Sequence, residues 1–345
     1  MMRYRVFVLA AIAAALLSLE VRAGLWRRAG RVQIDSVSSL PGGLGQLPPV
    51  PDNPENPITP AKVELGRQLF EDARLSGDES LSCASCHPKE LGYADSMRFS
   101  EGAGGQPMPR HTPTVLNVAY NRYINWDGKF ANIPQLVLAV LANPRNMNMQ
   151  DENVLVARLA SVPEYRAEFQ DVFDGPPTKE RVALAIDAYV RRLTTPNSPF
   201  DRYAAGDRRA LTEAQKRGLV LFVGKADCAM CHRGANFADD QFHALGITGA
   251  DTGRFKVTGV EADRFAFKTP TLRNVELTAP YMHDGSLSTL REVIDFYNGG
   301  GGAQRPKSPL LRRLELTEGE KADLEAFLES LTGSVETVKT QTAAR

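Results

Sequence analysis

Two stretches decide the fold: Cys83-Ala84-Ser85-Cys86-His87 and Cys228-Ala229-Met230-Cys231-His232. Both follow the pattern Cys-x-x-Cys-His, and together they contain all four cysteines of the chain. The spacing places two thiols about one helical turn apart, with an imidazole on the next residue. Four cysteines in 345 residues are too few for a disulfide scaffold, so their pairing beside histidine indicates another purpose.

Other landmarks repeat around these stretches in the same order, which indicates an internal duplication. A Gly-x-x-Leu-Phe segment precedes each stretch, beginning at Gly66 and at Gly218. Each stretch is followed by a Thr-Pro-Thr-x-x-Asn segment and then by an Asp-Gly pair. These later landmarks are Thr112–Asn117 with Asp127-Gly128, and Thr269–Asn274 with Asp284-Gly285. We place the boundary between the two units near Thr194–Asp207, where Pro, Ser and Gly cluster.

The composition describes a globular chain without a strong net charge. The 345 residues include 41 Lys and Arg against 41 Asp and Glu, and 43% are hydrophobic. Zero net charge argues against nucleic acid as a partner, and the chain has no P-loop motif. Helix-start signals occur at Thr59, Thr178, Thr212 and Thr317, whereas no run of residues alternates convincingly as a strand would. We therefore expect a mostly helical fold with long functional loops.

The N-terminus has the features of a secretory signal. Arg3 and Arg5 precede an apolar run over residues 6–19, and a small-x-small pattern follows at residues 21–23. Because the run is shorter than the about 20 residues that span a membrane, we predict a cleaved signal peptide over residues 1–23. An uncleaved membrane anchor is the alternative. Export would place the protein in a bacterial periplasm, where cysteines are oxidised, metal-bound or covalently attached.

The pattern Cys-x-x-Cys-His is the attachment motif of c-type haem. Two thiols one turn apart can form thioethers with the two vinyl groups at one porphyrin edge, and the following imidazole can bind the iron. We therefore assign Cys83, Cys86 and His87 to a first haem, and Cys228, Cys231 and His232 to a second. A zinc ribbon keeps its Cys pairs about 15–20 residues apart, much closer than here. A thioredoxin-like pair expects a βαβ setting, which the sequence does not indicate.

These motifs and several others together resemble the bacterial di-haem cytochrome c peroxidase/MauG family. The matching segments are Cys83–His87, Arg110–Thr114, Trp126–Gly128, Cys228–His232, Thr269–Asn274 and Ala279–Gly285. The resemblance implies an all-α fold of two cytochrome-c-like haem domains in tandem with long loops, over residues 58–200 and 201–335. An extended arm over residues 24–57 precedes them and a tail over residues 336–345 follows. The N-terminal haem is expected to react with hydrogen peroxide, and the C-terminal haem to relay electrons.

The resemblance also implies roles for single residues. Trp126 matches the Trp that lies between the two haems and helps electrons to pass; the alternative is a packed core aromatic. Tyr297 stands where the family's peroxidases place a Met ligand to the second iron and MauG-like members place a Tyr. Tyr297 is therefore the preferred distal ligand, and Met282 competes with it. His111, Thr278 and Pro280 match positions whose carbonyl oxygens hold an interdomain calcium ion, and such oxygens suit this cation.

The sequence departs from the family pattern around the first haem. No His occurs between His87 and His111, so the distal His that family peroxidases often carry near position 103 is missing and the first iron is expected to be open. Leu136 and Asn146 stand where the family has a distal Gln and Glu, with Gln135 one residue away as a substitute. Without a positioned base, peroxide cleavage should be slower. His111 is then either a distal group over the first haem or a structural residue at the interface.

Two functional hypotheses from different classes follow. In the first, the protein is an enzyme that binds peroxide at the first haem and spreads the oxidising equivalents through Trp126. Its electron donor is a small periplasmic electron-transfer protein or an oxidisable protein side chain. In the second, the protein is a non-enzymatic di-haem electron carrier whose first iron is closed by Met97, Met108, Met147 or Met149. Of the remaining histidines, His243 is expected in a loop and His283 near the second haem.

Overall fold

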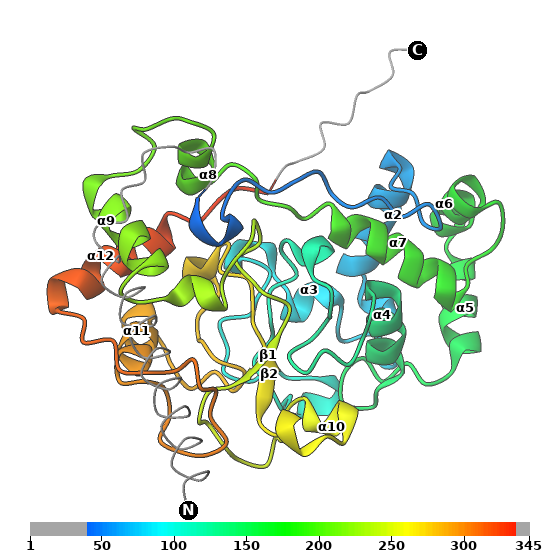
Figure 1. Cartoon of the computed structure of the whole chain (residues 1–345). Coiled ribbons are helices and arrows are strands. Elements are labelled where there is room, and N and C mark those ends of the chain that lie inside the picture. Colours follow the sequence, from blue (N-terminus) through cyan, green and yellow to red (C-terminus); the bar gives the residue numbers. More distant parts are fainter. Residues whose placement is uncertain (1–39, 336–345) are drawn as a thin grey trace, which may run out of the picture. The chain divides into compact units, whose positions relative to one another are not determined.

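The structure is a computed structural model in which residues 40–335 are described. The predicted signal peptide, residues 24–39 of the predicted arm and the tail over residues 336–345 lie outside the described residues. The described part is mainly helical with long loops, as predicted (Figure 1). Its helices are α2 (Pro60–Glu71), α3 (Cys83–Cys86), α4 (Ile133–Ala142), α5 (Glu152–Ser161), α6 (Pro163–Phe173), α7 (Lys179–Arg191), α8 (Pro199–Ala204), α9 (Glu213–Val223), α10 (Phe255–Thr258), α11 (Leu290–Asn298) and α12 (Glu318–Glu329).

Four of the described helices begin where the sequence predicts. The side chains of Thr59, Thr178, Thr212 and Thr317 each accept a hydrogen bond from a backbone N–H in the first turn. The two predicted capping boxes also form, because Gln215 and Glu320 bond back to the N–H groups of Thr212 and Thr317. These short-range contacts satisfy donors that a helix start leaves unpaired, which is why local sequence predicts them.

Each half is built on one pair of packed helices, α2 with α7 and α9 with α12. In both pairs the helices approach most closely at a repeated glycine. A Cβ atom on Gly66 would lie 2.0 Å from the carbonyl oxygen of Ala185, and one on Gly218 would lie 2.0 Å from that of Asp323. The Gly-x-x-Leu-Phe landmark is therefore a helix-crossing point, and its Leu69 and Phe222 are buried in the respective cores.

The later landmarks also repeat in conformation. Asn117 and Asn274 both adopt the left-handed region, with φ of 57° and 60°. The two residues meet at Thr195, whose Oγ1 accepts a bond from Nδ2 of Asn117 at 2.9 Å and donates to Oδ1 of Asn274 at 2.7 Å. All three side chains are buried. The duplication inferred from sequence is thus visible as two matching loops joined at one buried threonine.

One small sheet departs from the predicted absence of strands. Strands β1 (Phe242–Ala244) and β2 (Ala266–Lys268) pair antiparallel, with His243 opposite Phe267. The prediction that His243 lies in a loop is therefore wrong. The segment between the strands contacts the N-terminal half, because Nη1 of Arg254 donates to the carbonyl oxygens of Asp127 and Gly128 at 2.9 and 2.8 Å. This sheet belongs to the joint between the halves.

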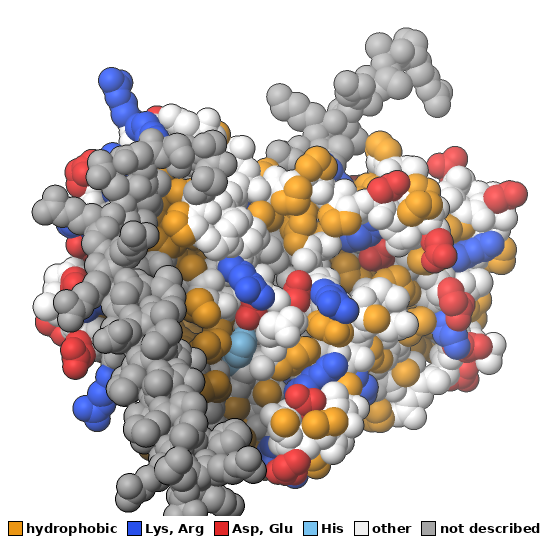
Figure 2. Space-filling view, in the orientation of Figure 1, with side chains coloured by type: hydrophobic (Ala, Val, Ile, Leu, Met, Phe, Trp, Pro, Cys, Tyr) orange, Lys and Arg blue, Asp and Glu red, His pale blue; other side chains and the backbone are white. Residues whose placement is uncertain are grey.

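The visible surface carries charges of both signs. On the face shown in Figure 2, Lys and Arg side chains are interspersed with Asp and Glu rather than gathered into one large patch. The pattern agrees with the equal numbers of basic and acidic residues in the chain. Among residues 40–335, no helix combines the length and the apolar character that crossing a bilayer requires.

Candidate functional site

The first Cys-x-x-Cys-His stretch forms a single helical turn, α3. The Oγ of Ser85 accepts a hydrogen bond from the N–H of Ser82 at 3.0 Å and fixes the start of the turn. The N–H of His87 donates to the carbonyl oxygen of Cys83 at 3.0 Å and ends it. Cys83, Cys86 and His87 all line a cavity of about 740 Å³. We call these three residues the first site.

The second stretch reaches the same cavity from the other half. Cys228–Met230 form a 3-10 turn that begins after Asp227, whose φ is 56°. The N–H of His232 donates to the carbonyl oxygen of Cys228 at 2.8 Å, which repeats the bond made by His87 in the first site. Cys228, Cys231 and His232 line the cavity, and we call them the second site.

Both histidines are held as neutral imidazoles. Nδ1 of His87 lies 2.9 Å from the carbonyl oxygen of Tyr93, and Nδ1 of His232 lies 3.0 Å from that of Phe237. A carbonyl oxygen only accepts, so each Nδ1 carries the proton and each Nε2 keeps its lone pair. Burial lowers the pKa of both imidazoles, that of His232 to about 4. An oriented neutral imidazole with a free Nε2 is the usual protein ligand of a transition metal.

The structure argues against two alternative roles for the four thiols, namely redox catalysis by a reactive thiolate and zinc binding. Burial raises the pKa of Cys83 and of Cys228 to about 12, so neither is a reactive thiolate at neutral pH. None of the four forms a disulfide. Within residues 40–335, the one cluster with the spacing of a metal site groups Cys231 with Asp239 and His243, and it does not bring the two Cys pairs together as a zinc ribbon would.

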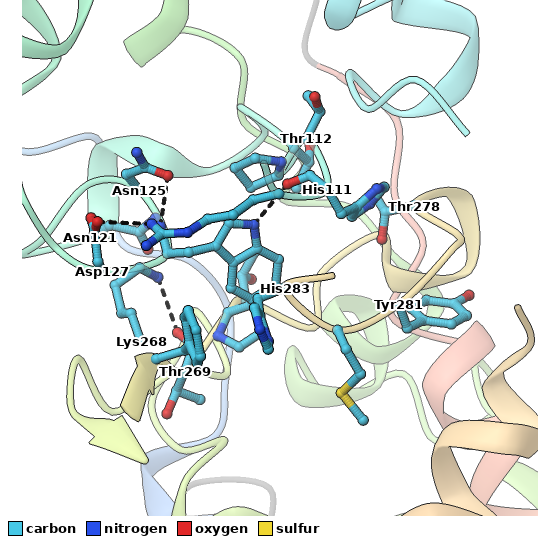
Figure 3. Close-up of a pocket in the computed structure, with 18 of the residues that line it drawn as sticks. His111, Thr112, Asn121, Asn125, Asp127, Lys268, Thr269, Thr278, Tyr281 and His283 are labelled. Atoms are coloured by element: carbon cyan, nitrogen blue, oxygen red, sulfur yellow. Dashed lines mark hydrogen bonds and ion pairs between the residues drawn. The ribbon is translucent and has the colours of Figure 1, made fainter. Parts of the chain in front are cut away.

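A buried lysine indicates that the cavity accepts an anionic group. The side chain of Lys268 is 7% exposed and lines the cavity (Figure 3). Its Nζ donates to the carbonyl oxygen of Thr269 at 3.0 Å, and it forms no ion pair with a carboxylate among the described residues. Burial lowers the pKa of this ammonium to about 8. The carboxylates of Asp240 and Asp239 oppose this shift, but neither forms an ion pair with Nζ, so a carboxylate of a porphyrin could bind this buried cation directly.

These features fit two covalently held porphyrins. Each site offers two thiols for thioether bonds and one imidazole with a free Nε2, and the mostly apolar cavity between them includes the buried ammonium of Lys268. The fold and the sites therefore define a di-haem protein of the c type.

Comparisons with known proteins establish the family. The family model for di-haem cytochrome c peroxidase matches residues 60–209, and the model for cytochrome c matches residues 215–332. The methylamine utilization protein MauG of Methylorubrum extorquens is 42% identical over 79% of this chain and 79% of its own. The cytochrome-c peroxidase IdrP1 of Pseudomonas sp. is 38% identical over 84% and 86% of the two chains.

A solved structure gives the same result. A MauG-like protein associated with microbial copper homeostasis aligns with a TM-score of 0.79 and 34% identity, over 86% of this chain and 95% of its own. The chain belongs to the di-haem cytochrome c peroxidase/MauG family, whose members carry two c-type haems. It is accordingly an enzyme, a peroxidase-like oxidoreductase with two cytochrome-c-like domains in tandem.

Trp126 and His111 lie together where the two halves meet. The indole Nε1 of Trp126 donates to the carbonyl oxygen of His111, and the carbonyl oxygen of Trp126 accepts from the N–H of Lys268 in β2 at 2.8 Å. The N–H of His111 donates to the carbonyl oxygen of His283 at 2.9 Å. Figure 3 shows His111, Lys268 and His283 beside this joint. Both Trp126 and His111 line the cavity, but their contacts tie the halves together.

The side chain of His111 is also held from behind. Its Nδ1 lies 2.9 Å from the carbonyl oxygen of Met97, so Nδ1 donates there, and the residue is 3% exposed. Of the two roles considered for His111, these three bonds favour the structural one. His283 stacks on Phe267, with 3.6 Å between ring centroids, and it too lines the cavity. His243, the residue misassigned to a loop, lines the cavity with its Nε2 2.9 Å from Oδ2 of Asp239.

An ion-pair network that sequence reasoning missed crosses the joint. The guanidinium of Arg110 bonds to both carboxylate oxygens of Asp251, at 2.6 and 3.0 Å, and contacts Asp127 at 2.8 Å. This arrangement raises the pKa of Arg110 and holds that of Asp251 well below its usual range. Arg110 lies in a recognised motif, but Asp251 lies outside all of the repeated landmarks, so nothing in the sequence signals the pair.

Tyr297 lies near the end of α11 and lines the cavity with the second site. Burial raises the pKa of its phenol, and the thiols of Cys231 and Cys228 raise it further. Met282 also lines the cavity. Both candidates for the distal ligand of the second iron therefore line the cavity.

The wall that the N-terminal half gives to the cavity has Leu136 and Asn146 at the positions where the family has a glutamine and a glutamate. Leu136 and Asn146 line the cavity, whereas Gln135 does not. The side chain of Gln135 is exposed, with its Oε1 3.4 Å from the N–H of Ala131, so the expected substitution by Gln135 is wrong. Of the four methionines considered as closing ligands, only Met108 and Met147 line the cavity.

Proposed function

We propose that hydrogen peroxide reacts at the first site and that electrons are relayed through the second site. The observation that supports this division is the asymmetry between the sites. Tyr297 of the C-terminal half offers a phenol to the second iron, whereas Val140, at the matching position of the N-terminal repeat, is apolar, and both residues line the cavity. When bound, a haem iron with an open sixth position supplies the centre at which peroxide binds and is reduced.

The residues of the chain would bind the haems, balance their charge and orient the peroxide. Cys83, Cys86, Cys228 and Cys231 anchor the haems, while His87 and His232 bind the irons through Nε2 with their orientation fixed by the Tyr93 and Phe237 carbonyls. Lys268 places its charge against a carboxylate of a bound group. Asn146 offers an amide that can orient peroxide by hydrogen bonding. Because an amide does not exchange protons near neutral pH, we expect slow turnover.

Trp126 carries electrons between the two sites. Its indole is fixed by the carbonyl of His111 from its own half, and its backbone is fixed by the N–H of Lys268 from the other half. A side chain held from both sides keeps one distance to each site, which a relay requires. His111 acts here as a positioning residue rather than as an acid or a base.

The donor is an electron-transfer protein or an oxidisable protein side chain, and Tyr297 favours the second. A phenolate ligand stabilises the ferric state and lowers the potential relative to a thioether, which suits a site that reaches high oxidation states. The relatives named MauG and MauG-like support the same direction. The predicted signal peptide over residues 1–23 supports a periplasmic location. We also propose calcium at the carbonyl oxygens of His111, Thr278 and Pro280, which all line the cavity.

The test is a spectrum of the purified, oxidised di-haem protein before and after peroxide is added. The proposal predicts a high-spin ferric signal from the first site that changes on addition, and a low-spin signal from the second. Two low-spin irons that ignore peroxide, in both the oxidised and the half-reduced protein, would contradict it and favour an electron carrier closed by Met108 or Met147. Trapping the protein that is oxidised when peroxide is added then identifies the donor.

A further inference from the structure

The two halves differ in the aromatic side chains packed behind their iron-binding histidines. The helix-crossing glycines give the correspondence, since a Cβ on Gly66 would meet Tyr189 and one on Gly218 would meet Phe327. The carbonyl groups that accept from the histidines give a second correspondence, between Tyr93 and Phe237. At both positions the N-terminal half has a phenol where the C-terminal half has a phenyl ring.

The aromatic rings packed around these two positions are otherwise arranged alike in both halves. In the N-terminal half the ring centroid of Phe70 lies 5.3 Å from Tyr189, 6.4 Å from Tyr93 and 6.3 Å from His87. In the C-terminal half the rings of Phe222, Phe237 and Phe327 lie 5.2 to 6.4 Å from one another. Packing alone is therefore satisfied by phenylalanine at both positions.

The two phenols are buried and bonded to each other. Tyr93 is 3% exposed and Tyr189 is 8% exposed. Their Oη atoms lie 3.3 Å apart and share a hydrogen bond. A buried hydroxyl needs a partner to offset its lost hydration, and here each phenol supplies that partner for the other. The pair thus costs little in stability, but it adds something that a phenyl ring lacks, namely a side chain that can give up one electron.

We propose that Tyr93 and Tyr189 form an internal electron reserve for the first site. The inference rests on the proposed function, because it requires peroxide to react at that site. The carbonyl oxygen of Tyr93 accepts the hydrogen bond from Nδ1 of His87, which would bind the first iron. One of the two phenols therefore belongs to the residue that orients this histidine. Tyr189, the second phenol, is a buried residue of α7. The second site, which relays electrons, has no such reserve behind His232.

The electron and proton balance is complete with peroxide as the oxidant. A tyrosine phenol has an ordinary pKa of about 10, so both are protonated at neutral pH. Each phenol loses one electron to the first site, its O–H bond breaks and a neutral phenoxyl radical remains. Two phenols supply the two electrons and two protons that convert one hydrogen peroxide, with cleavage of its O–O bond, to two waters. Both phenolic protons pass to solvent, and the peroxide takes up two protons from solvent, so the overall charge stays balanced.

The function of such a reserve is to discharge the first site when the external donor is absent. An oxidised site without a donor attacks its own surroundings, and a buried radical pair confines that oxidation to two defined residues. The donor later reduces both phenoxyl radicals and restores the phenols.

The experiment adds peroxide to the oxidised di-haem protein without any reductant and records radical spectra of rapidly frozen samples. Protein carrying ring-deuterated tyrosine identifies a tyrosine radical by its narrowed hyperfine pattern. The variants are Tyr93→Phe, Tyr189→Phe and the double variant, which should fold because Phe237 and Phe327 fill the matching places. Tyr165→Phe is the control, since Tyr165 is a buried phenol of the same half that bonds to Asp72 instead.

The proposal predicts a deuteration-sensitive signal that is lost in the double variant and kept in Tyr165→Phe. The optical change of the first site on peroxide addition is followed in the same samples. The reserve is wrong, and the proposed function stands, if the optical change persists but the unmodified protein gives no radical signal. The same conclusion follows if the optical change persists and the radical signal is as strong in the double variant as in the unmodified protein. If the optical change itself is absent from the unmodified protein, the proposed function fails and the reserve fails with it.

Discussion

The indole Nε1 of Trp126 donates a hydrogen bond of 2.8 Å to the carbonyl oxygen of His111. The same His111 donates its own N–H to the carbonyl oxygen of His283, which lies in the other half of the chain. A single residue therefore positions the indole and joins the halves. The position of Trp126 therefore depends on how the two halves pack against each other. The residues that position Trp126 are also different from the cysteines and histidines that bind the haems.

We predict that Trp126→Phe uncouples the two sites without abolishing the reaction at the first. Phenylalanine keeps an aromatic ring at this half-buried position but loses both the readily oxidised indole and the N–H that binds His111. Rapid mixing with peroxide should show the first site reacting as before, while oxidation of the second site slows by at least about tenfold. The control is Tyr123→Phe, because the ring of Tyr123 packs on Phe242 of β1 at the same joint, with 5.4 Å between ring centroids. Equal rates at the second site in Trp126→Phe and the unmodified protein would remove Trp126 from the electron path.

We predict that Tyr297→Phe changes the absorption and magnetic spectra of the second iron. Removal of the phenol takes away the oxygen ligand, whereas Met282→Leu keeps Tyr297 and should leave those spectra unchanged. The potential of the second haem should rise in Tyr297→Phe, because a phenolate favours the ferric state. The opposite pattern, with only Met282→Leu altering the second iron, would assign the ligand to Met282.

The parts of the site that sequence predicted are those specified by local chemistry. Both Cys-x-x-Cys-His turns are five-residue units whose geometry follows from one helical turn, so the anchoring residues could be named without a structure. The pair of Arg110 and Asp251 could not, because 141 positions separate its members and only folding brings them together. The Tyr93 and Tyr189 pair is similar, since its meaning appears only when the halves are superimposed in space.

The fold divides in the same way. Helix starts at Thr212 and Thr317 were predictable because capping involves residues three apart. Strands β1 and β2 were missed because three residues are too few to show alternation. Their pairing depends on contacts with the other half, such as the bond from Lys268 to Trp126, which local sequence does not encode.

We predict that Asp251→Asn destabilises the protein at neutral pH and loses its effect in acid. The pKa of Asp251 is held below its usual range, so its contribution is present above the unfolded-state pKa of about 4 and is lost as pH falls through the lower folded-state value. The pair is mostly buried, with 12% and 18% of the two side chains exposed. We expect a loss of about 1–3 kcal/mol at pH 7, measured by denaturant unfolding.

The matched control is Glu261→Gln, which breaks the exposed pair with Arg264 and should change little. A difference between Asp251→Asn and the unmodified protein that stays constant from pH 7 down to about 3 would show that the charge of Asp251 is not what stabilises the joint.

We predict that chelation of calcium loosens the joint and slows electron transfer between the sites. The carbonyl oxygens of His111, Thr278 and Pro280 are backbone groups, so His111→Asn should retain the ion although it removes the imidazole bond to Met97. Metal analysis and titration calorimetry should give similar calcium affinity in this variant and in the unmodified protein. Readdition of Ca²⁺, but not of Mg²⁺, should restore the rate. Protein that contains no calcium and is indifferent to chelators would dismiss the site.

Finally, we predict that the helix-crossing glycines tolerate no side chain. A Cβ on Gly66 would lie 2.0 Å from the carbonyl oxygen of Ala185, and one on Gly218 equally close to that of Asp323, so each helix pair must separate. Gly66→Ala and Gly218→Ala should each cost at least about 2 kcal/mol in urea unfolding of the di-haem protein, as overpacked cores do. Gly319→Ala is the matched control, because that helical position has open space around it, and the better helix former should stabilise by about 0.5–1 kcal/mol. If all three variants behave alike, the close approach at these glycines does not hold the helix pairs together.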